Sequence, residues 1–211
     1  MNSIFRNRHF ITEDDWSKND LDTVFETSFD LKKRFALGEP HRLLQDKTLF
    51  MIFFEQSTRT RNSMEAGMTQ LGGHAHDLTA DKMQIAHGES AKDTAIILSR
   101  MGHGIASRNC FYGTGNAYLN EMAQYSKCPV MSLQDDVYHP FQGLADLMTI
   151  FEHFGRDPRG LKVTVSWAYA ESHAKPLSVP QTQILLFPRY GLDVTVAHPP
   201  DFPLSKAIVE K

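Results

Sequence analysis

The sequence predicts an α/β fold built on a parallel sheet, and three observations support it. Strand-like apolar segments alternate with segments whose apolar residues recur at helical spacing. The segment 48–54 is apolar on both faces, as expected for a strand that helices cover on each side. Glycines and short polar segments separate the elements. In such folds, ligands bind beyond the carboxyl ends of the strands.

The first half of the chain contains two predicted helices and two predicted strands. Residues 20–37 form a helix, because their apolar side chains fall on roughly one face and Gly38 follows as a stop signal. Strand 48–54 comes next, followed by a polar loop and a helix that ends at Gly72-Gly73. Residues 74–78 are expected to form a short strand.

The alternation continues through the middle of the chain. Residues 90–101 form a helix, which Ser90 and Asp93 open in a capping-box pattern. The next predicted elements are strand 104–108, helix 116–126, strand 129–133 and helix 140–154, which ends at Gly155.

A linker divides the chain into two predicted parts. Its best candidate is the sequence Asp-Pro-Arg-Gly at 157–160. We expect residues 1–155 to form a domain whose parallel sheet is flanked by helices. Residues 161–211 are too few for a closed second domain and correspond to the start of one. Their predicted elements are strand 161–167, helix 179–190 and strand 192–197.

Composition and charge exclude several classes of protein. The 211 residues are 41% hydrophobic and 22% charged, which is enough for a packed core. The net charge of -3 comes without a basic stripe, so neither nucleic acid nor a membrane is an expected partner. The longest strongly apolar run, 49–54, is too short to cross a bilayer. Cys110 and Cys128 lack metal-ligand spacing, and a reduced cytoplasmic setting fits best.

An anion-binding site is predicted where strand 48–54 ends. The segment that follows enters a helix and combines hydroxyl with guanidinium groups: Ser57-Thr58-Arg59-Thr60-Arg61. The hydroxyls and the free N–H groups of a helix N-terminus can point at one anion. The two arginines add a forked donor geometry that suits phosphate. The alternative is a plain helix cap with solvated arginines.

Two further candidates lie near the ends of later strands. Pro140 fits the first helical position, which makes His139 the N-cap and places Gln142 in the first turn. An imidazole N–H and a carboxamide there can recognise a small planar group that bears a carbonyl and an NH2. Arg108 ends strand 104–108. The alternatives are a capping histidine, a first-turn glutamine and a solvated arginine. The polar loop 81–89 is either solvated or reaches a ligand.

Together these segments resemble the aspartate/ornithine carbamoyltransferase family. The resemblance covers nearly the whole chain and rests on motifs in order: Ser57-Thr-Arg-Thr-Arg61, Gly88-Glu-Ser-x-Lys-Asp-Thr94, Arg108, and His139-Pro-x-Gln142 continuing into Leu144-Ala-Asp146. It implies that residues 1–155 are a carbamoyl-phosphate-binding domain and that 161–211 begin an acceptor-binding domain. It further implies that Ser57, Thr58, Arg59 and Thr60 bind the phosphate of carbamoyl phosphate.

The resemblance also assigns the other end of the ligand. Arg108, His139 and Thr60 would face the carbonyl oxygen and carry the catalysis, and Gln142 would contact the amide nitrogen. Gln84 matches a glutamine that, in the ornithine branch, reaches the site of a neighbouring subunit. The implied assembly is therefore at least a trimer.

The implied activity is transfer of the carbamoyl group to the amine of a small amino-acid-like acceptor, with release of phosphate. This chemistry needs no metal and no organic cofactor. One alternative is a non-catalytic protein that binds carbamoyl phosphate or phosphate. A nucleotide-binding oxidoreductase is a weaker alternative, because Gly113-Thr-Gly115 lacks a third properly spaced glycine. The sequence identifies neither the acceptor nor a base.

One segment narrows the branch of the family. Residues 167–181, with Pro176 and Pro180, resemble the proline-containing loop of the knotted carbamoyltransferases, and most closely those of unknown acceptor. The alternative is an ordinary rigid loop before a helix. The family's His-Cys-Leu-Pro segment and its later acceptor-binding positions have no match here. We therefore expect the natural polypeptide to continue beyond Lys211.

Overall fold

A four-stranded parallel sheet is the main layer of the computed structural model, which describes residues 5–167 and 174–211. Its strands lie in the order β2-β1-β3-β4, and every neighbouring pair is parallel. Their bounds are β1 (Thr48–Phe53), β2 (His74–Thr79), β3 (Gly104–Asn109) and β4 (Val130–Asp135). The predicted parallel α/β class is confirmed.

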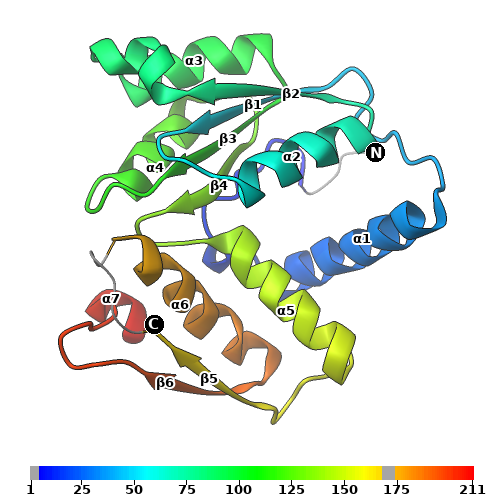
Figure 1. Ribbon diagram of the computed structural model, residues 1–211, viewed down its shortest axis with the longest axis vertical. Helices are drawn as coiled ribbons and strands as arrows, with labels where there is room; N and C mark the ends of the chain where they lie inside the picture. The colour runs from blue at the N-terminus through cyan, green and yellow to red at the C-terminus, as the bar shows by residue number, and fades with distance from the viewer. Residues whose placement is uncertain (1–4, 168–173) are drawn as a thin grey trace.

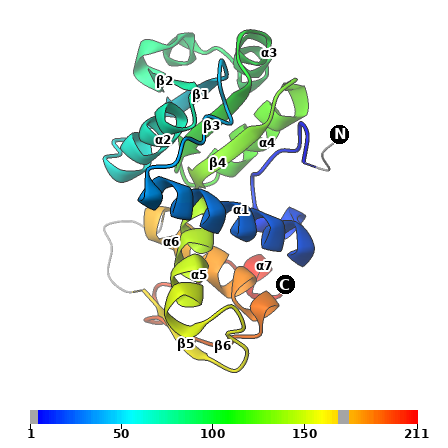
Figure 2. The same ribbon diagram turned by 90° about the vertical axis from the view of Figure 1, so that its right-hand side faces the viewer.

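Helices cover both faces of this sheet (Figures 1 and 2). Successive side chains of a strand point to opposite faces, so the two apolar sets of β1 meet different helices. Phe50 and Ile52 belong to a core with α3 and α4, whereas Met51 packs on the side of α2, beside Met68. The helices of this part are α1 (Lys18–Leu37), α2 (Arg59–Gln70), α3 (Ala91–Met101), α4 (Gly115–Tyr125) and α5 (Pro140–Phe154).

The helix ends follow from local sequence signals. Ser17 caps α1 in a complete capping box with Asp20, and Gly38 ends the helix at a φ of +67°, a left-handed conformation that favours glycine. At α3, Ser90 accepts the N–H of Asp93 as predicted. The reciprocal contact differs, because the hydroxyl of Ser90 donates to the carboxylate of Asp93 at 2.8 Å.

The second part of the chain contains a two-stranded parallel sheet and two helices. These elements are β5 (Lys162–Ser166), α6 (Ala174–Leu186), β6 (Asp193–Ala197) and α7 (Lys206–Val209). Helix α6 starts and ends earlier than the predicted 179–190. Pro180 lies inside it, so the alternative of a rigid loop is wrong at that position. Residues 168–173 of the predicted knot-forming loop lie outside the described residues.

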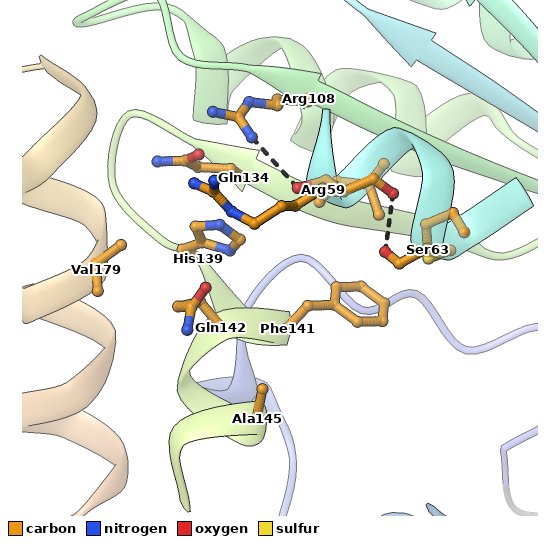
Figure 3. A pocket seen from close by; sticks show the side chains of 12 residues that line it. Arg59, Ser63, Arg108, Gln134, His139, Phe141, Gln142, Ala145 and Val179 are labelled. Atoms are coloured by element: carbon orange, nitrogen blue, oxygen red, sulfur yellow. Dashed lines mark hydrogen bonds between the residues drawn. The ribbon is translucent and has the colours of Figure 1, made fainter. Parts of the chain in front are cut away.

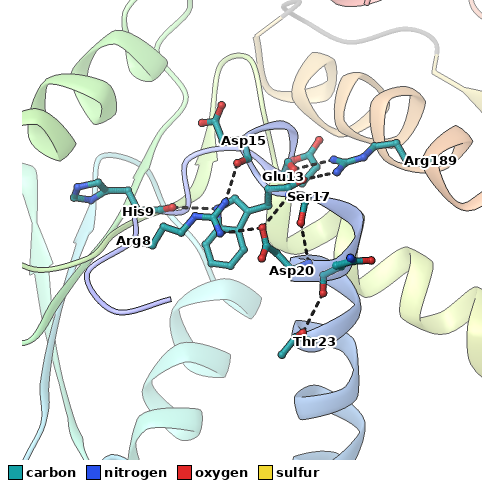
Figure 4. Close-up of polar contacts among 10 residues, drawn as sticks. Arg8, His9, Glu13, Asp15, Ser17, Asp20, Thr23 and Arg189 are labelled. Atoms are coloured by element: carbon teal, nitrogen blue, oxygen red, sulfur yellow. Dashed lines mark hydrogen bonds and ion pairs between the residues drawn. The ribbon is translucent and has the colours of Figure 1, made fainter. Parts of the chain in front are cut away.

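The two parts share a hydrophobic core. Buried residues of the N-terminal segment, α1 and α5 form one cluster with residues of β5, the end of α6 and the segment after it: Phe10, Trp16, Leu21, Phe25, Leu144, Leu147, Phe151, Val165, Leu186, Phe187, Tyr190 and Leu192. A polar contact joins the same elements, since Arg189 donates to the backbone oxygens of Glu13 (2.9 Å) and Trp16 (Figure 4). This core fixes α6 against α5, where the site lies.

Four 3-10 helices complete the described elements. Their bounds are η1 (Glu13–Asp15), η2 (Ala80–Lys82), η3 (Gln84–His87) and η4 (Pro188–Tyr190). Over residues 5–167 and 174–211, no helix has the length and apolar character that a membrane span requires.

Candidate functional site

A pocket of about 420 Å³ opens at the carboxyl ends of β3 and β4, where the fold class predicts ligand binding. The start of α2 forms one wall, α5 forms another, and α6 contributes a residue from the second part of the chain (Figure 3). The lining residues are Arg59, Thr60, Ser63, Met64, Arg108, Leu133, Gln134, His139, Phe141, Gln142, Ala145 and Val179.

The predicted phosphate segment lies at the N-terminus of α2. Thr58 is the N-cap and makes no side-chain capping hydrogen bond. Arg59 and Thr60, the first two residues of the helix, line the pocket, but the exposed Thr58 does not. Ser57 lines an adjoining cavity of about 550 Å³ together with Arg61. The structure therefore brings two of the four predicted phosphate residues directly into the pocket.

Arg108 connects the end of β3 to the phosphate segment. Its Nη1 donates to Thr60 Oγ1 at 3.4 Å and to Ser57 Oγ at 3.5 Å. These long contacts leave the guanidinium able to shift toward a stronger acceptor such as phosphate or a carbonyl oxygen. Arg108 is thus the residue through which Ser57, although outside the pocket lining, contacts the site.

Glu55, which the sequence analysis did not single out, lies behind Arg108. Its Oε2 is 4.0 Å from Arg108 Nε, and neither atom has a hydrogen-bond partner among the described residues. Its Oε1 accepts the backbone N–H of Cys110 at 2.9 Å. Burial raises the pKa of the Cys110 thiol to about 12, so this cysteine is protonated at neutral pH.

His139 is the N-cap of α5, as predicted, with Pro140 in the first helical position. It is buried, and its backbone N–H donates to Thr182 Oγ1 of α6 at 2.9 Å. Burial, with the charge of Arg108, lowers the pKa of His139 to about 4. Its Nδ1 has no hydrogen-bond partner among the described residues. The side chain is therefore a neutral imidazole with one N–H donor and capacity to bind a ligand.

Two glutamine side chains complete the polar lining. Gln142 lies in the first turn of α5, and its Nε2 donates to Asp146 Oδ1 at 2.8 Å. Gln134, which the sequence analysis missed, is buried at the end of β4 and donates to Ser178 Oγ of α6 at 2.9 Å. Its position near the carboxyl end of β4 could have marked Gln134 as a candidate, because ligands bind at strand ends. It was missed because the predicted strand ended at residue 133.

Gln84 lies apart from this pocket. It is exposed in η3 and is absent from the residues that line the cavity. A role within its own site is therefore not supported by its position. The predicted role in the site of a neighbouring subunit stays a prediction.

The pocket has two chemically distinct ends. Arg59, Arg108 and Thr60 supply positive charge and a hydroxyl, which suit an anion. His139 and Gln142 supply neutral hydrogen-bonding groups, which suit a small planar polar head. The described residues contain no group of three or more His, Cys, Asp or Glu side chains that could hold a metal ion.

The fold and this pocket define a class: an α/β protein with a pocket suited to a small anionic molecule where the strands of a parallel sheet end. Comparison with known families identifies the member of that class. Residues 8–152 match the model of the aspartate/ornithine carbamoyltransferase family, carbamoyl-P binding domain. The chain therefore belongs to the aspartate/ornithine carbamoyltransferase family.

Individual relatives agree with this assignment. The chain is 34% identical over its whole length to the putative carbamoyltransferase YgeW of Escherichia coli strain K12, and it covers 57% of that protein. The ornithine carbamoyltransferase from Pyrococcus furiosus superposes with a TM-score of 0.88 at 34% identity, over 98% of this chain and 62% of that one. An acetylornithine transcarbamylase complexed with acetylcitrulline superposes with a TM-score of 0.84 at 29% identity, over 96% and 65%.

Proposed function

We propose that the pocket binds carbamoyl phosphate and that the chain provides this part of an enzyme that carbamoylates the amine of a small, amino-acid-like acceptor and releases phosphate. The observation that carries this proposal is the convergence of Arg59, Thr60, Arg108, His139 and Gln142 on one pocket. These residues come from three segments that are far apart in the sequence, namely the start of α2, the end of β3 and the start of α5, so local sequence effects do not explain their meeting.

The phosphate of carbamoyl phosphate binds at the start of α2. Arg59 offers a guanidinium inside the pocket, and the first turn of α2 offers backbone N–H groups that its N-cap side chain does not bond. Thr58 and Ser57 add hydroxyls at the rim of the same helix end. Leaving-group charge develops on this phosphate as the reaction proceeds, so positive groups here assist its departure.

The carbamoyl group binds toward α5. Attack by the acceptor amine turns the carbonyl into a tetrahedral centre whose oxygen carries negative charge. Arg108, Thr60 and His139 donate to that oxygen. Loss of one such donor typically lowers the turnover number by about 10²–10³. Because His139 is neutral, it acts as a hydrogen-bond donor and not as a protonated acid.

The acceptor enters from the side of the second part of the chain. Residues 1–155 form the carbamoyl-phosphate-binding domain in this proposal, and residues 161–211 begin the acceptor-binding domain. In support, α6 reaches the pocket through Val179. The printed names of the relatives include ornithine and acetylornithine enzymes, which supports an amino-acid-like acceptor. The chain covers 57% of the YgeW protein, so the complete activity is assigned to the full-length enzyme.

The test is a carbamoylation assay with the full-length enzyme. Carbamoyl phosphate is incubated with a panel of amino acids and their N-acyl derivatives, and products are followed by mass spectrometry with phosphate release measured in parallel. We expect one class of acceptor to gain a carbamoyl group with stoichiometric phosphate release. Tight binding of carbamoyl phosphate without any transfer would instead support a non-catalytic binding protein.

A further inference from the structure

Helix α5 carries a hydrogen bond that fixes the orientation of a carboxamide in the pocket. Gln142 and Asp146 are four residues apart and therefore lie on the same face of the helix. Gln142 Nε2 donates to Asp146 Oδ1 at 2.8 Å. An ionised carboxylate has only acceptors, so it can bind the NH2 end of the amide and repels the oxygen end.

The consequence is that the oxygen of Gln142 is turned away from Asp146. Figure 3 shows this oxygen on the side of the side chain that faces His139, and the nitrogen on the opposite side. A carboxamide can normally exchange its two ends by rotation, but the Asp146 carboxylate favours the orientation that turns the NH2 group toward it. The pocket is thereby given an acceptor at a defined position.

Asp146 is itself held from the second part of the chain. Its other oxygen, Oδ2, accepts Nε2 of Gln183 on α6 at 2.7 Å. Both carboxylate oxygens of Asp146 are thus used by amide donors, one from the pocket side and one from α6. The orientation of Gln142 therefore depends on its hydrogen bond to Asp146 and, through Asp146, on Gln183 of α6.

We propose that Asp146, supported by Gln183, is a positioning residue that makes Gln142 select a ligand with an NH2 group over an isosteric ligand with a methyl group. This inference rests on the proposed function, because it assigns the carbamoyl NH2 to Gln142. An oriented oxygen accepts a hydrogen bond from that NH2. A methyl ketone of the same shape offers no donor and leaves the oxygen without a partner.

The matched probes are phosphonoacetamide and 2-oxopropylphosphonate, which differ only in NH2 against CH3. Isothermal titration calorimetry of the 211-residue chain measures both dissociation constants, with inorganic phosphate as a third ligand. We expect wild-type protein to prefer the amide by about tenfold, the value of one hydrogen bond. In Asp146→Asn the preference falls to about twofold, because the introduced carboxamide can accept from or donate to either end of Gln142, while phosphate affinity stays unchanged.

Two further variants make the test specific. Gln142→Ala loses the preference directly, and adding Asp146→Asn to Gln142→Ala changes it no further if Asp146 acts through Gln142. Gln183→Leu, outside the pocket lining, is expected to weaken the preference less than Asp146→Asn does. An Asp146→Asn protein that keeps the full preference overturns the inference, and so does one that loses phosphate affinity to the same extent. A wild-type chain that binds phosphate but neither phosphonate probe contradicts the proposed function itself.

Discussion

His139 combines deep burial with a neighbouring positive charge, and both keep its ring neutral. Its pKa is lowered to about 4, first by burial and then by Arg108. We predict that the His139 ring stays unprotonated from pH 8 down to about pH 5, so that its nuclear magnetic resonance chemical shifts do not change over this range. A His139→Gln variant assigns the signal. A midpoint near 6.5, the unperturbed value, would show that the ring is solvated.

Glu13 carries a buried carboxyl group and does not belong to the pocket lining. It is fully buried, and neither of its carboxyl oxygens has a hydrogen-bond partner among the described residues. Its pKa is raised to about 7, mainly by burial and in smaller part by Asp14 and Asp135, whereas Arg189 acts to lower it. Glu13 is therefore largely protonated below neutral pH, and ionising it in place costs free energy.

This raised pKa predicts how stability depends on pH. Between the unfolded value of 4.5 and about 7, the folded state binds the Glu13 proton more tightly, so its contribution to stability is lost as pH rises through that window. The full difference corresponds to about 3 kcal/mol at most. We expect Glu13→Gln to remove this dependence. Urea unfolding at pH 5 and pH 8 measures it, with the wild type losing stability relative to the variant at the higher pH.

A result in which the stability difference between wild type and Glu13→Gln is the same at both pH values would contradict the raised pKa. The comparison between the two proteins is needed because His139 acts in the opposite direction. Its lowered pKa makes stability fall as pH decreases from 6.5 toward 4. Both proteins contain His139, so its contribution cancels when the stability of Glu13→Gln is subtracted from that of the wild type.

Residue identity and residue environment were not equally predictable. Arg59, Thr60, Arg108, His139 and Gln142 were all named from motifs, and all five line one pocket. Glu55 and Gln134 have roles that depend on contacts with other elements, which no spacing in the sequence reveals. The four-residue spacing of Gln142 and Asp146 places both on one helix face, but the contact of Asp146 with Gln183 of α6 depends on packing. Burial of Glu13 likewise depends on the packing of η1 against α6, two elements far apart in the chain.

At the scale of elements, α6 is the helix that fixes the mouth of the pocket. Its buried Thr182 accepts the backbone N–H of His139 at 2.9 Å. Thr182→Val keeps the shape but leaves that buried N–H without a partner. We predict a loss of about 1–3 kcal/mol in the free energy of unfolding, measured by urea denaturation. The matched control is Thr149→Val on α5, whose hydroxyl is exposed and bonds within its own helix.

An equal effect of the two threonine substitutions would contradict the role assigned to the Thr182 contact.

Helix α6 also shows the limit of the sequence signals. Most strands and helices were predicted close to their observed positions, because apolar periodicity and glycine stops mark them. The start of α6 was predicted several residues late, because prolines at 176 and 180 favour a loop locally. Packing against α5 outweighs that preference: Gly143 leaves room for Thr182, and a Cβ at position 143 would clash with the Thr182 side chain.

At the scale of the whole molecule, the trimer proposal rests on the resemblance of Gln84 to a glutamine that reaches a neighbouring subunit's site, and Gln84 is exposed outside the pocket lining. If Gln84 completes the site of a neighbouring subunit, Gln84→Ala and Arg59→Ala each weaken binding when alone. Mixed trimers then contain some sites with both residues intact. We predict that mixing the two variants under conditions of subunit exchange restores part of the phosphonoacetamide binding, measured by calorimetry. Exchange is checked by native mass spectrometry, and exchange without any recovery of binding would count against a shared site.

The central claim is that the start of α2 binds the phosphate of carbamoyl phosphate, and two neighbouring arginines allow a direct test of it. Arg59 lines the pocket, whereas Arg61 forms an ion pair with Asp77. The Cζ atom of Arg61 also lies 4.4 Å from the centre of the Phe53 ring. The measurement is a calorimetric titration of phosphonoacetamide into wild-type, Arg59→Ala and Arg61→Ala proteins. We predict that Arg59→Ala loses about 1.5–3 kcal/mol of binding free energy, the value of a charged hydrogen bond, and that Arg61→Ala loses much less. Equal losses in the two variants, or unchanged affinity in Arg59→Ala, would contradict the account.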